Sequence, residues 1–259
     1  MAALRTTIVS LSFTLLTAAS ALAGAPLETD DAGTVDVGAF EIGISGSYMS
    51  DKEGTAKATS HDAELSLGTG IYKNLGISIA LPYNMSTREK DSGVLVGKDD
   101  GFGDMSVDIK YAFAEVSGVN LAIRPGVVLP TGKSSMTEDH VQLTTALIAT
   151  KEFNDGAYAM HANLGYEYHT YKDSNDGMRR NLWSASLAGE AELAKGFIAV
   201  ADFGLASNED KTSNDLPTYA LAGARYEIND NLEVNAGVKL GLTKQEDDIS
   251  VLYGLLLKF

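Results

Sequence analysis

Alternation of apolar and polar residues is the main pattern along this chain, and it is clearest at the C-terminus. From Ile249 to Phe259 every second residue is apolar or aromatic, and Ser250, Gly254 and Lys258 lie between them. A period of two places the two sets on opposite faces of a β-strand. A tilted strand of about ten residues is long enough to cross the hydrocarbon core of a membrane. The segment predicts either a lipid-facing strand of a membrane barrel or a half-buried edge strand of a soluble protein.

The same alternation recurs along the rest of the chain and predicts about twelve strands. We expect them at 38–49, 60–72, 75–85, 102–113, 120–130, 139–152, 157–170, 181–193, 197–207, 217–228, 231–243 and 249–259.

The connections between these segments alternate in length. Short turns are expected at 72–75, 114–119, 154–156, 194–196 and 229–231, and longer charged loops at 50–59, 86–101, 131–138, 171–180, 208–216 and 244–248. Outer-membrane barrels have short periplasmic turns and longer extracellular loops, whereas a soluble sandwich has no reason to sort its loops in this way. The sequence therefore predicts an all-β fold, a closed antiparallel transmembrane β-barrel over residues 38–259, in the outer membrane of a Gram-negative-type cell.

The N-terminus predicts export. Arg5 is followed by an apolar run from Thr6 to Ala19 and by the small residues of Ala21-Leu22-Ala23, which is the pattern of a secretory signal peptide over residues 1–23. Residues 24–37 form a polar, acidic lead without a clear period. We expect this lead on the periplasmic side, from which it could fold inward as a plug.

Composition narrows the classes of function. The formal net charge is −15 and cysteine is absent. Such acidity argues against nucleic acid as a partner, because binding it requires a basic surface. Without cysteine the exported protein cannot form disulfides, so its stability must come from strand pairing and packing.

The phase of the alternation separates two faces. In the segment 104–113, Val107, Ile109 and Tyr111 point to one side, and Asp104 and Asp108 point to the other. A soluble barrel would invert this arrangement, with the apolar face inside, so phase alone does not decide. Loop sorting and the terminal Phe259 favour apolar residues in lipid and a polar lumen.

The polar face yields candidate lumen-lining residues. Those that we single out are Glu64, Asp104, Asp108, Lys110, Arg124, Glu167, Glu190, Asp202, Arg225, Glu227 and Lys239. Carboxylates outnumber bases, which favours a water-accessible path with a mild preference against anions. The alternative is that these charges pair across strands and fill a sealed tube. Lys110, Arg124 and Arg225 are the residues that we expect to tune passage.

Two motifs superficially resemble phosphate-binding loops. Gly101-Phe-Gly-Asp104 leads into a strand and not into a helix, so no helix N-terminus is available for an anion. Pro130-Thr-Gly-Lys-Ser134 lacks the earlier glycine of a nucleotide loop, because residue 127 is valine. Neither predicts nucleotide binding.

These stretches instead carry a family resemblance. Gly101-Phe-Gly-Asp-Met-Ser-Val-Asp-Ile-Lys-Tyr111, Ile123-Arg-Pro-Gly-Val-Val-Leu-Pro-Thr-Gly-Lys133 and the lead Pro26-Leu-Glu-Thr-Asp-Asp-Ala32 resemble the meta-pathway phenol degradation family of outer-membrane transporters. The resemblance extends from about residue 26 to the end of the chain and implies a barrel that passes small hydrophobic or aromatic compounds. It implies no specific functional residues.

Our hypothesis is a passive, porin-like channel for small molecules, hydrophobic or aromatic compounds among them, and not an enzyme. The expected partners are outer-membrane lipid and lipopolysaccharide, a small-molecule solute and the barrel-assembly machinery, for which Phe259 would be the assembly signal. We expect a monomer. The alternative is a structural or adhesive barrel with a sealed lumen.

Catalysis and cofactors are not predicted. A lipid-hydrolysing barrel would need a serine beside a histidine, and His140 has Ser134 and Ser135 nearby in sequence, but no local pattern supplies a third group. His161 and His169 lie on one strand about 27 Å apart, at roughly 3.4 Å per residue, so they cannot ligate one metal ion. We therefore predict no catalytic residues, no metal and no cofactor.

Overall fold

The computed structural model of the protein describes residues 25–137, 140–171 and 177–259. The predicted signal peptide, residues 1–23, lies outside these ranges. No helix in the described part of the chain is both long and apolar enough to cross a membrane. The described strands are β1 Phe40–Glu53, β2 Ala56–Tyr72, β3 Leu75–Asp91, β4 Val94–Phe102, β5 Met105–Val116, β6 Val119–Leu129, β7 Gln142–Phe153, β8 Tyr158–His169, β9 Asn181–Ala194, β10 Phe197–Ala206, β11 Thr218–Asn229, β12 Leu232–Gly241 and β13 Ile249–Lys258.

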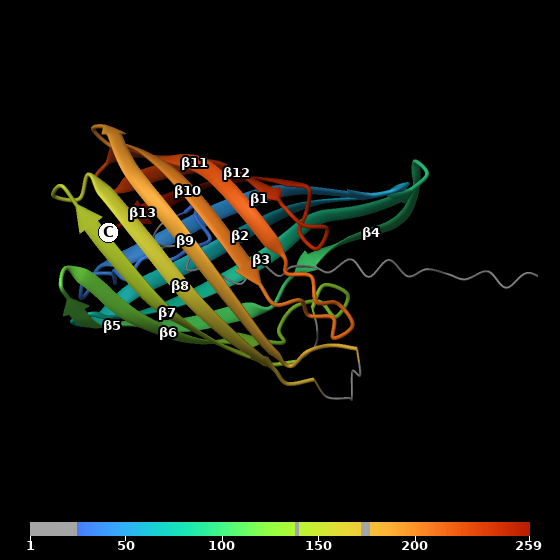
Figure 1. Cartoon of the computed structure of the whole chain (residues 1–259), viewed down its shortest axis with the longest axis horizontal. Helices are drawn as coiled ribbons and strands as arrows, with labels where there is room; N and C mark the ends of the chain where they lie inside the picture. The colour runs from blue at the N-terminus through green and yellow to red at the C-terminus, as the bar shows by residue number, and fades with distance from the viewer. Residues whose placement is uncertain (1–24, 138–139, 172–176) are drawn as a thin grey trace, which may run out of the picture.

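All strands except β4 form a closed antiparallel barrel (Figure 1). Each strand pairs with its neighbour in sequence, β3 pairs with β5 across the β4 excursion, and β1 pairs with β13. The register of the closing pair runs from Glu41 opposite Lys258 to Ser50 opposite Ile249. Closure leaves no free edge within the membrane, where unpaired backbone groups would find no water. The predicted twelve-stranded barrel is confirmed.

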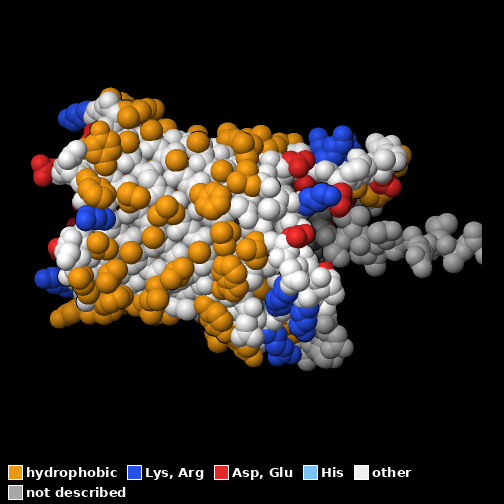
Figure 2. Space-filling model, in the orientation of Figure 1, with side chains coloured by type: hydrophobic (Ala, Val, Ile, Leu, Met, Phe, Trp, Pro, Cys, Tyr) orange, Lys and Arg blue, Asp and Glu red, His pale blue; other side chains and the backbone are white. Residues whose placement is uncertain are grey.

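The outer surface is apolar, as the alternation requires. Leu65, Leu67 and Ile109 on β2 and β5 are exposed, whereas Asp104 and Asp108 are buried. Hydrophobic side chains cover the barrel wall, and charged side chains gather at its two ends (Figure 2). An apolar belt of this kind would be unfavourable in water and is stable in lipid. The protein is therefore an outer-membrane barrel surrounded by lipid and lipopolysaccharide.

Two of the predicted extracellular loops are largely strand. The stretch 86–101 was expected to be a loop, but β3 continues to Asp91 and β4 returns along it, with Asp91 opposite Val94 and Asn84 opposite Gly101. β1 and β2 likewise extend through most of 50–59. This four-stranded extension projects beyond the other loops (Figure 1). Water covers both of its faces, so its polar sequence carries no hydrophobic period and gave no signal of strands.

Candidate functional site: a lumen divided by the N-terminal segment

Residues 25–37, here called the N-terminal segment, lie inside the barrel. At the short-turn rim, Val37 bridges Gly70 of β2, and the backbone N–H of Gly38 donates to the carbonyl of Gly70 at 3.1 Å. A side chain at position 70 would collide with the backbone of Val35 and Asp36, so glycine permits this close approach. From there the segment follows the inner wall toward the middle of the lumen.

Asp30 is the most strongly held residue of the segment. One carboxylate oxygen accepts from Lys110 Nζ on β5 and the other from Arg124 Nη1 on β6, each at 2.7 Å. The Asp30 side chain is 1% exposed, and those of Lys110 and Arg124 are 11% and 12% exposed. Removing one member of such a buried set would leave unpaired charge behind, at a cost of about 3–5 kcal/mol.

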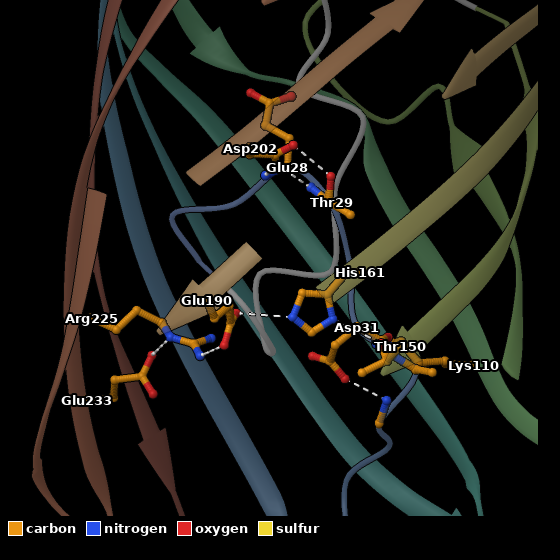
Figure 3. Close-up of polar contacts among 12 residues, drawn as sticks. Glu28, Thr29, Asp31, Lys110, Thr150, His161, Glu190, Asp202, Arg225 and Glu233 are labelled. Carbon is orange, nitrogen blue, oxygen red and sulfur yellow. Dashed lines mark hydrogen bonds and ion pairs between the residues drawn. The ribbon is translucent and has the colours of Figure 1, made fainter. Parts of the chain in front are cut away.

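A second polar anchor holds the segment against the opposite wall. Asp202 on β10 accepts from the backbone N–H groups of Glu28 and Thr29, each at 2.8 Å, and from the Thr29 hydroxyl at 2.7 Å (Figure 3). Hydrogen bonds to an ionised carboxylate are stronger than those between neutral groups. Glu28 itself pairs with Lys239 on β12 at 2.9 Å. The two anchors fix successive residues of the segment to different sides of the barrel.

Apolar residues of the segment dock on patches of the inner wall. Leu27 packs in a buried cluster with Ala188, Val200, Tyr219 and Leu221. Ala32 packs with Ala122, Ala146 and Ile148. The lumen is therefore not uniformly polar: it has small apolar patches where the segment lies. Burial of these side chains adds a hydrophobic contribution to the polar anchors.

A chain of polar groups continues from the segment into the wall at Ala32. Its backbone N–H donates to Thr150 Oγ1 at 2.8 Å, and that hydroxyl lies 2.9 Å from His161 Nδ1. His161 Nε2 faces Glu190 at 3.5 Å, and Arg225 donates to Glu190 at 2.5 Å (Figure 3). Since the Thr150 oxygen already accepts from Ala32, its own proton is available for Nδ1, which leaves the proton of neutral His161 on Nε2, toward Glu190.

Asp31 is kept ionised by its surroundings. Burial opposes ionisation, but the Lys110 ammonium and the Gly33 backbone N–H outweigh it and lower the pKa of Asp31 below its ordinary value. The Gly33 N–H donates to Asp31 Oδ1 at 2.5 Å, and Lys110 Nζ donates to the Asp31 carbonyl at 3.1 Å. Asp31 therefore adds to the docking of the segment at neutral pH.

The segment separates open space on its two sides. On the extracellular side lies a cavity of about 250 Å³, here called the outer vestibule, bounded by Leu27 of the segment, by Leu252 beside the Leu27 cluster, and by Met49 and Met136 farther out. A second cavity of about 180 Å³ adjoins it near Lys239. On the periplasmic side a cavity of about 150 Å³ lies between Asp31, Glu41 and Lys110.

The structure distributes the candidate lumen residues among distinct positions. Glu64, Asp104, Asp108, Arg124 and Glu167 border the outer vestibule. Lys110 and Arg124 hold Asp30, and Asp202 holds Thr29. Glu190 and Arg225 pair in the wall, and Lys239 lies between Glu28 and Glu246. Glu227 is exposed at the short-turn rim and borders none of these three cavities.

Sequence reasoning did not identify Thr29, Asp30, Thr150 or His161 as parts of one assembly. Strand phase marks a residue as inward but does not name its partner. The acidic character of the lead was a usable signal, since Asp30 and Asp31 lie where the basic residues Lys110 and Arg124 need counter-charges.

The histidines form separate contacts. His169 faces Glu167 at 3.4 Å and the Tyr171 hydroxyl at 3.2 Å, and the His140 ring lies against Tyr171. Ser135 is hydrogen-bonded to Asp99. No group of three or more His, Asp and Glu side chains in the described ranges is arranged to hold a metal ion.

Comparisons with known proteins agree with this fold. The profile of a protein family described as "Putative MetA-pathway of phenol degradation" matches residues 60–259. No curated protein matches the sequence.

Three solved structures illustrate the likeness. An outer membrane channel from Pseudomonas putida F1 is 13% identical with a TM-score of 0.75, covering 88% of this chain and 98% of that one. The NanC porin is 14% identical with a TM-score of 0.56, covering 84% and 100%. The KdgM porin is 14% identical with a TM-score of 0.54, covering 85% and 99%.

Proposed function

The chain belongs to this phenol-degradation family, and from that premise we propose that it is a passive outer-membrane channel for small solutes whose lumen is closed by the N-terminal segment. The observation that carries the proposal is the position of this segment between two cavities of about 250 and 150 Å³. A twelve-stranded barrel lies between small barrels filled by side chains and large open pores. In such a barrel a short inserted segment is enough to close the lumen.

The way in which the segment is held supports a reversible closure. Its main anchors are ion pairs and hydrogen bonds, at Asp30 and Asp202, together with two small apolar patches. Water can replace the partners of polar anchors when the segment moves. Displacement of the segment toward the periplasm would join the cavities into one path without changing the pairing of the wall.

The solutes that we propose are small, and family membership adds hydrophobic or aromatic compounds to the candidates. The channels and porins among the structural neighbours support passive passage and not chemistry. The protein would act as a monomer, and Phe259 would be read by the assembly machinery. In the closed barrel Phe259 and Phe40 exchange backbone hydrogen bonds of 2.9 and 3.1 Å.

Planar-bilayer recording tests the proposal. The wild type should give rare or small current steps, and a variant lacking residues 26–36 should give frequent, larger ones, because the closing segment is gone. Heat-modifiable gel mobility must first show that the variant forms a closed barrel. A folded deletion variant without any current would overturn the channel proposal.

A second candidate is a structural barrel with a sealed lumen. The observation that favours it is the buried ion pairing across the interior, at Asp30 with Lys110 and Arg124 and at Glu190 with Arg225. This candidate predicts that both proteins remain silent in the bilayer.

A further inference from the structure

The outer vestibule combines apolar surface with carboxylates in excess. Among the described residues that border it, six are carboxylates, at positions 28, 62, 64, 104, 108 and 167, and one, Arg124, is a base. That base is already held by Asp30 of the N-terminal segment at 2.7 Å. Glu28 is also paired, with Lys239 at 2.9 Å, and the remaining carboxylates leave the vestibule negative, with no free cation of its own in the described part of the chain.

One of these carboxylates, Glu64, has no basic partner in the described part of the chain. Glu64 on β2 forms no ion pair with a Lys, Arg or His side chain among the described residues, and Asp108 on β5 adds a second negative charge to the wall of the same cavity. Like charges around a partly dry cavity repel each other, and an ammonium group beside Glu64 would reduce that repulsion. The other acids are better satisfied: Asp62, for example, accepts from Ser60 at 2.6 Å and from Asn84 at 2.5 Å.

Buried polar groups without partners mark the same space. Ser47 on β1 and Gln142 on β7 are each 3% exposed and border the vestibule. The Ser47 hydroxyl and the Gln142 side-chain nitrogen lack hydrogen-bond partners within the described structure. Buried polar atoms in native proteins are almost always paired, so these two indicate a ligand or water in the vestibule.

The remaining walls would suit an apolar body. Leu27 of the segment, Val128 on β6 and Leu252 on β13 border the cavity, and Met49 and Met136 lie toward its extracellular end. Methionine side chains adapt to ligands of varied shape and make favourable contacts with aromatic rings. A volume of about 250 Å³ is at the low end for a ligand pocket, so the occupant must be small.

We propose that the outer vestibule is a binding site for a small organic cation, with an ammonium group attracted by the carboxylates of Glu64 and Asp108 and an apolar or aromatic body against Leu27, Val128 and Leu252. This inference rests on the proposed channel function, since it names the class of solute that would bind on the extracellular side of the N-terminal segment while the lumen is closed. It separates cationic from neutral aromatic solutes, which the family membership does not.

Three probes of similar size and different charge test the proposal: benzylamine, benzyl alcohol and benzoate. Titration calorimetry on the full mature protein in detergent should show benzylamine bound at least about tenfold more tightly than benzyl alcohol, which is the gain expected from a charge-assisted contact. Benzoate should not bind. Equal affinities of benzylamine and benzyl alcohol would overturn the proposal.

Variants connect the binding to the two carboxylates. The double variant Glu64→Gln, Asp108→Asn should lose about tenfold or more in benzylamine affinity, and the rim variant Glu227→Gln should stay within about twofold of wild type. All three proteins are compared in the same detergent, so partition of the probe into micelles cancels. An unchanged double variant that retains heat-modifiable mobility would place the amine elsewhere and sink the proposal.

Methylammonium tests the apolar half of the site. It should bind much more weakly than benzylamine because it lacks the body that contacts the apolar wall, and equal binding would contradict this part. The result is independent of conduction. A barrel that binds benzylamine but conducts no current contradicts the channel proposal and supports the binding site. A barrel that conducts but binds all the probes equally supports the channel and contradicts the binding site.

Discussion

The two halves of this lumen use the same kinds of side chain in opposite ways. Where the N-terminal segment docks, opposite charges pair: Asp30 lies between Lys110 and Arg124, and Glu190 pairs with Arg225. In the outer vestibule carboxylates outnumber bases, and Glu64 forms no ion pair with a base in the described part of the chain. Paired charges hold a segment of the chain in place, whereas an unbalanced set attracts a charge from outside. Inward-facing charged residues in a barrel can therefore have different roles. Where positive and negative side chains pair, they hold the segment that closes the lumen, and where one sign is in excess they favour binding of a solute of the opposite charge.

The largest expected effect comes from removing one charge of the ion pairs that hold the N-terminal segment. Asp30→Asn removes the anion between Lys110 and Arg124 and leaves two cations close together in the lumen. If about 3 kcal/mol of docking is lost, the displaced state of the segment gains roughly 100-fold. Open probability in planar bilayers should rise accordingly. The control is Asp36→Asn, an exposed carboxylate of the same segment, and an Asp30 variant as quiet as this control would contradict the role of the anchor.

Asp202→Asn should act in the same direction with a smaller effect. The amide can keep one oxygen for the N–H groups of Glu28 and Thr29, which share Asp202 Oδ2, but its NH₂ then replaces the oxygen that accepts from the Thr29 hydroxyl, and the negative charge is lost. Loss of charge-assisted hydrogen bonds worth about 1.5–3 kcal/mol predicts roughly a tenfold rise in open probability. Asp230→Asn, in a short exposed turn, provides the matched control. A rise in open probability larger than that of the Asp30 variant would show that Asp202, and not Asp30, is the stronger of the two anchors.

Acid should also weaken the closure. The pKa of Asp31 is lowered in the docked segment, so its contribution to docking is complete at neutral pH and is lost as the pH falls below about 4 and through the docked pKa. Current recordings from pH 7 to pH 3 should show increasing open probability. Open probability should depend less steeply on pH in the variant Asp31→Asn. Acid-induced closing would show that other groups dominate.

The smallest expected effect concerns the ion selectivity that the carboxylates of the outer vestibule give to the open channel. In the Asp30→Asn background, adding Glu64→Gln and Asp108→Asn should reduce the potassium-to-chloride permeability ratio by about two- to fivefold, because carboxylates along a pore raise the barrier for anions. Reversal potentials in a salt gradient measure the ratio. Adding Glu227→Gln instead should leave it unchanged. A ratio that stays constant in both would show that the vestibule carboxylates do not face the path.

The extracellular extension shows where sequence patterns fail in this protein. The polar stretch at residues 86–101 was interpreted as a loop, yet it forms the end of β3 and most of β4. Strands are recognised by alternation only when one face is buried or in lipid, and this hairpin has water on both sides. At the opposite rim, where the short turns lie, the structure agrees with the prediction, because these turns are too short to contain an additional strand.

By itself the sequence determined the barrel. Alternation with a period of two and the alternation of short turns with long connections are local features, and in lipid both of them favour the same closed sheet. The period of two also predicts that Asp104, Asp108 and Lys110 lie on one face of the segment 104–113.

Only the tertiary structure decided which inward charges pair. The contacts of Asp30 with Lys110 and Arg124 span 80 and 94 residues, and that of Thr29 with Asp202 spans 173. Such partners depend on how far the strands are staggered around the barrel and on where a segment without periodicity comes to lie. No local pattern encodes either quantity, because both arise when the whole sheet closes.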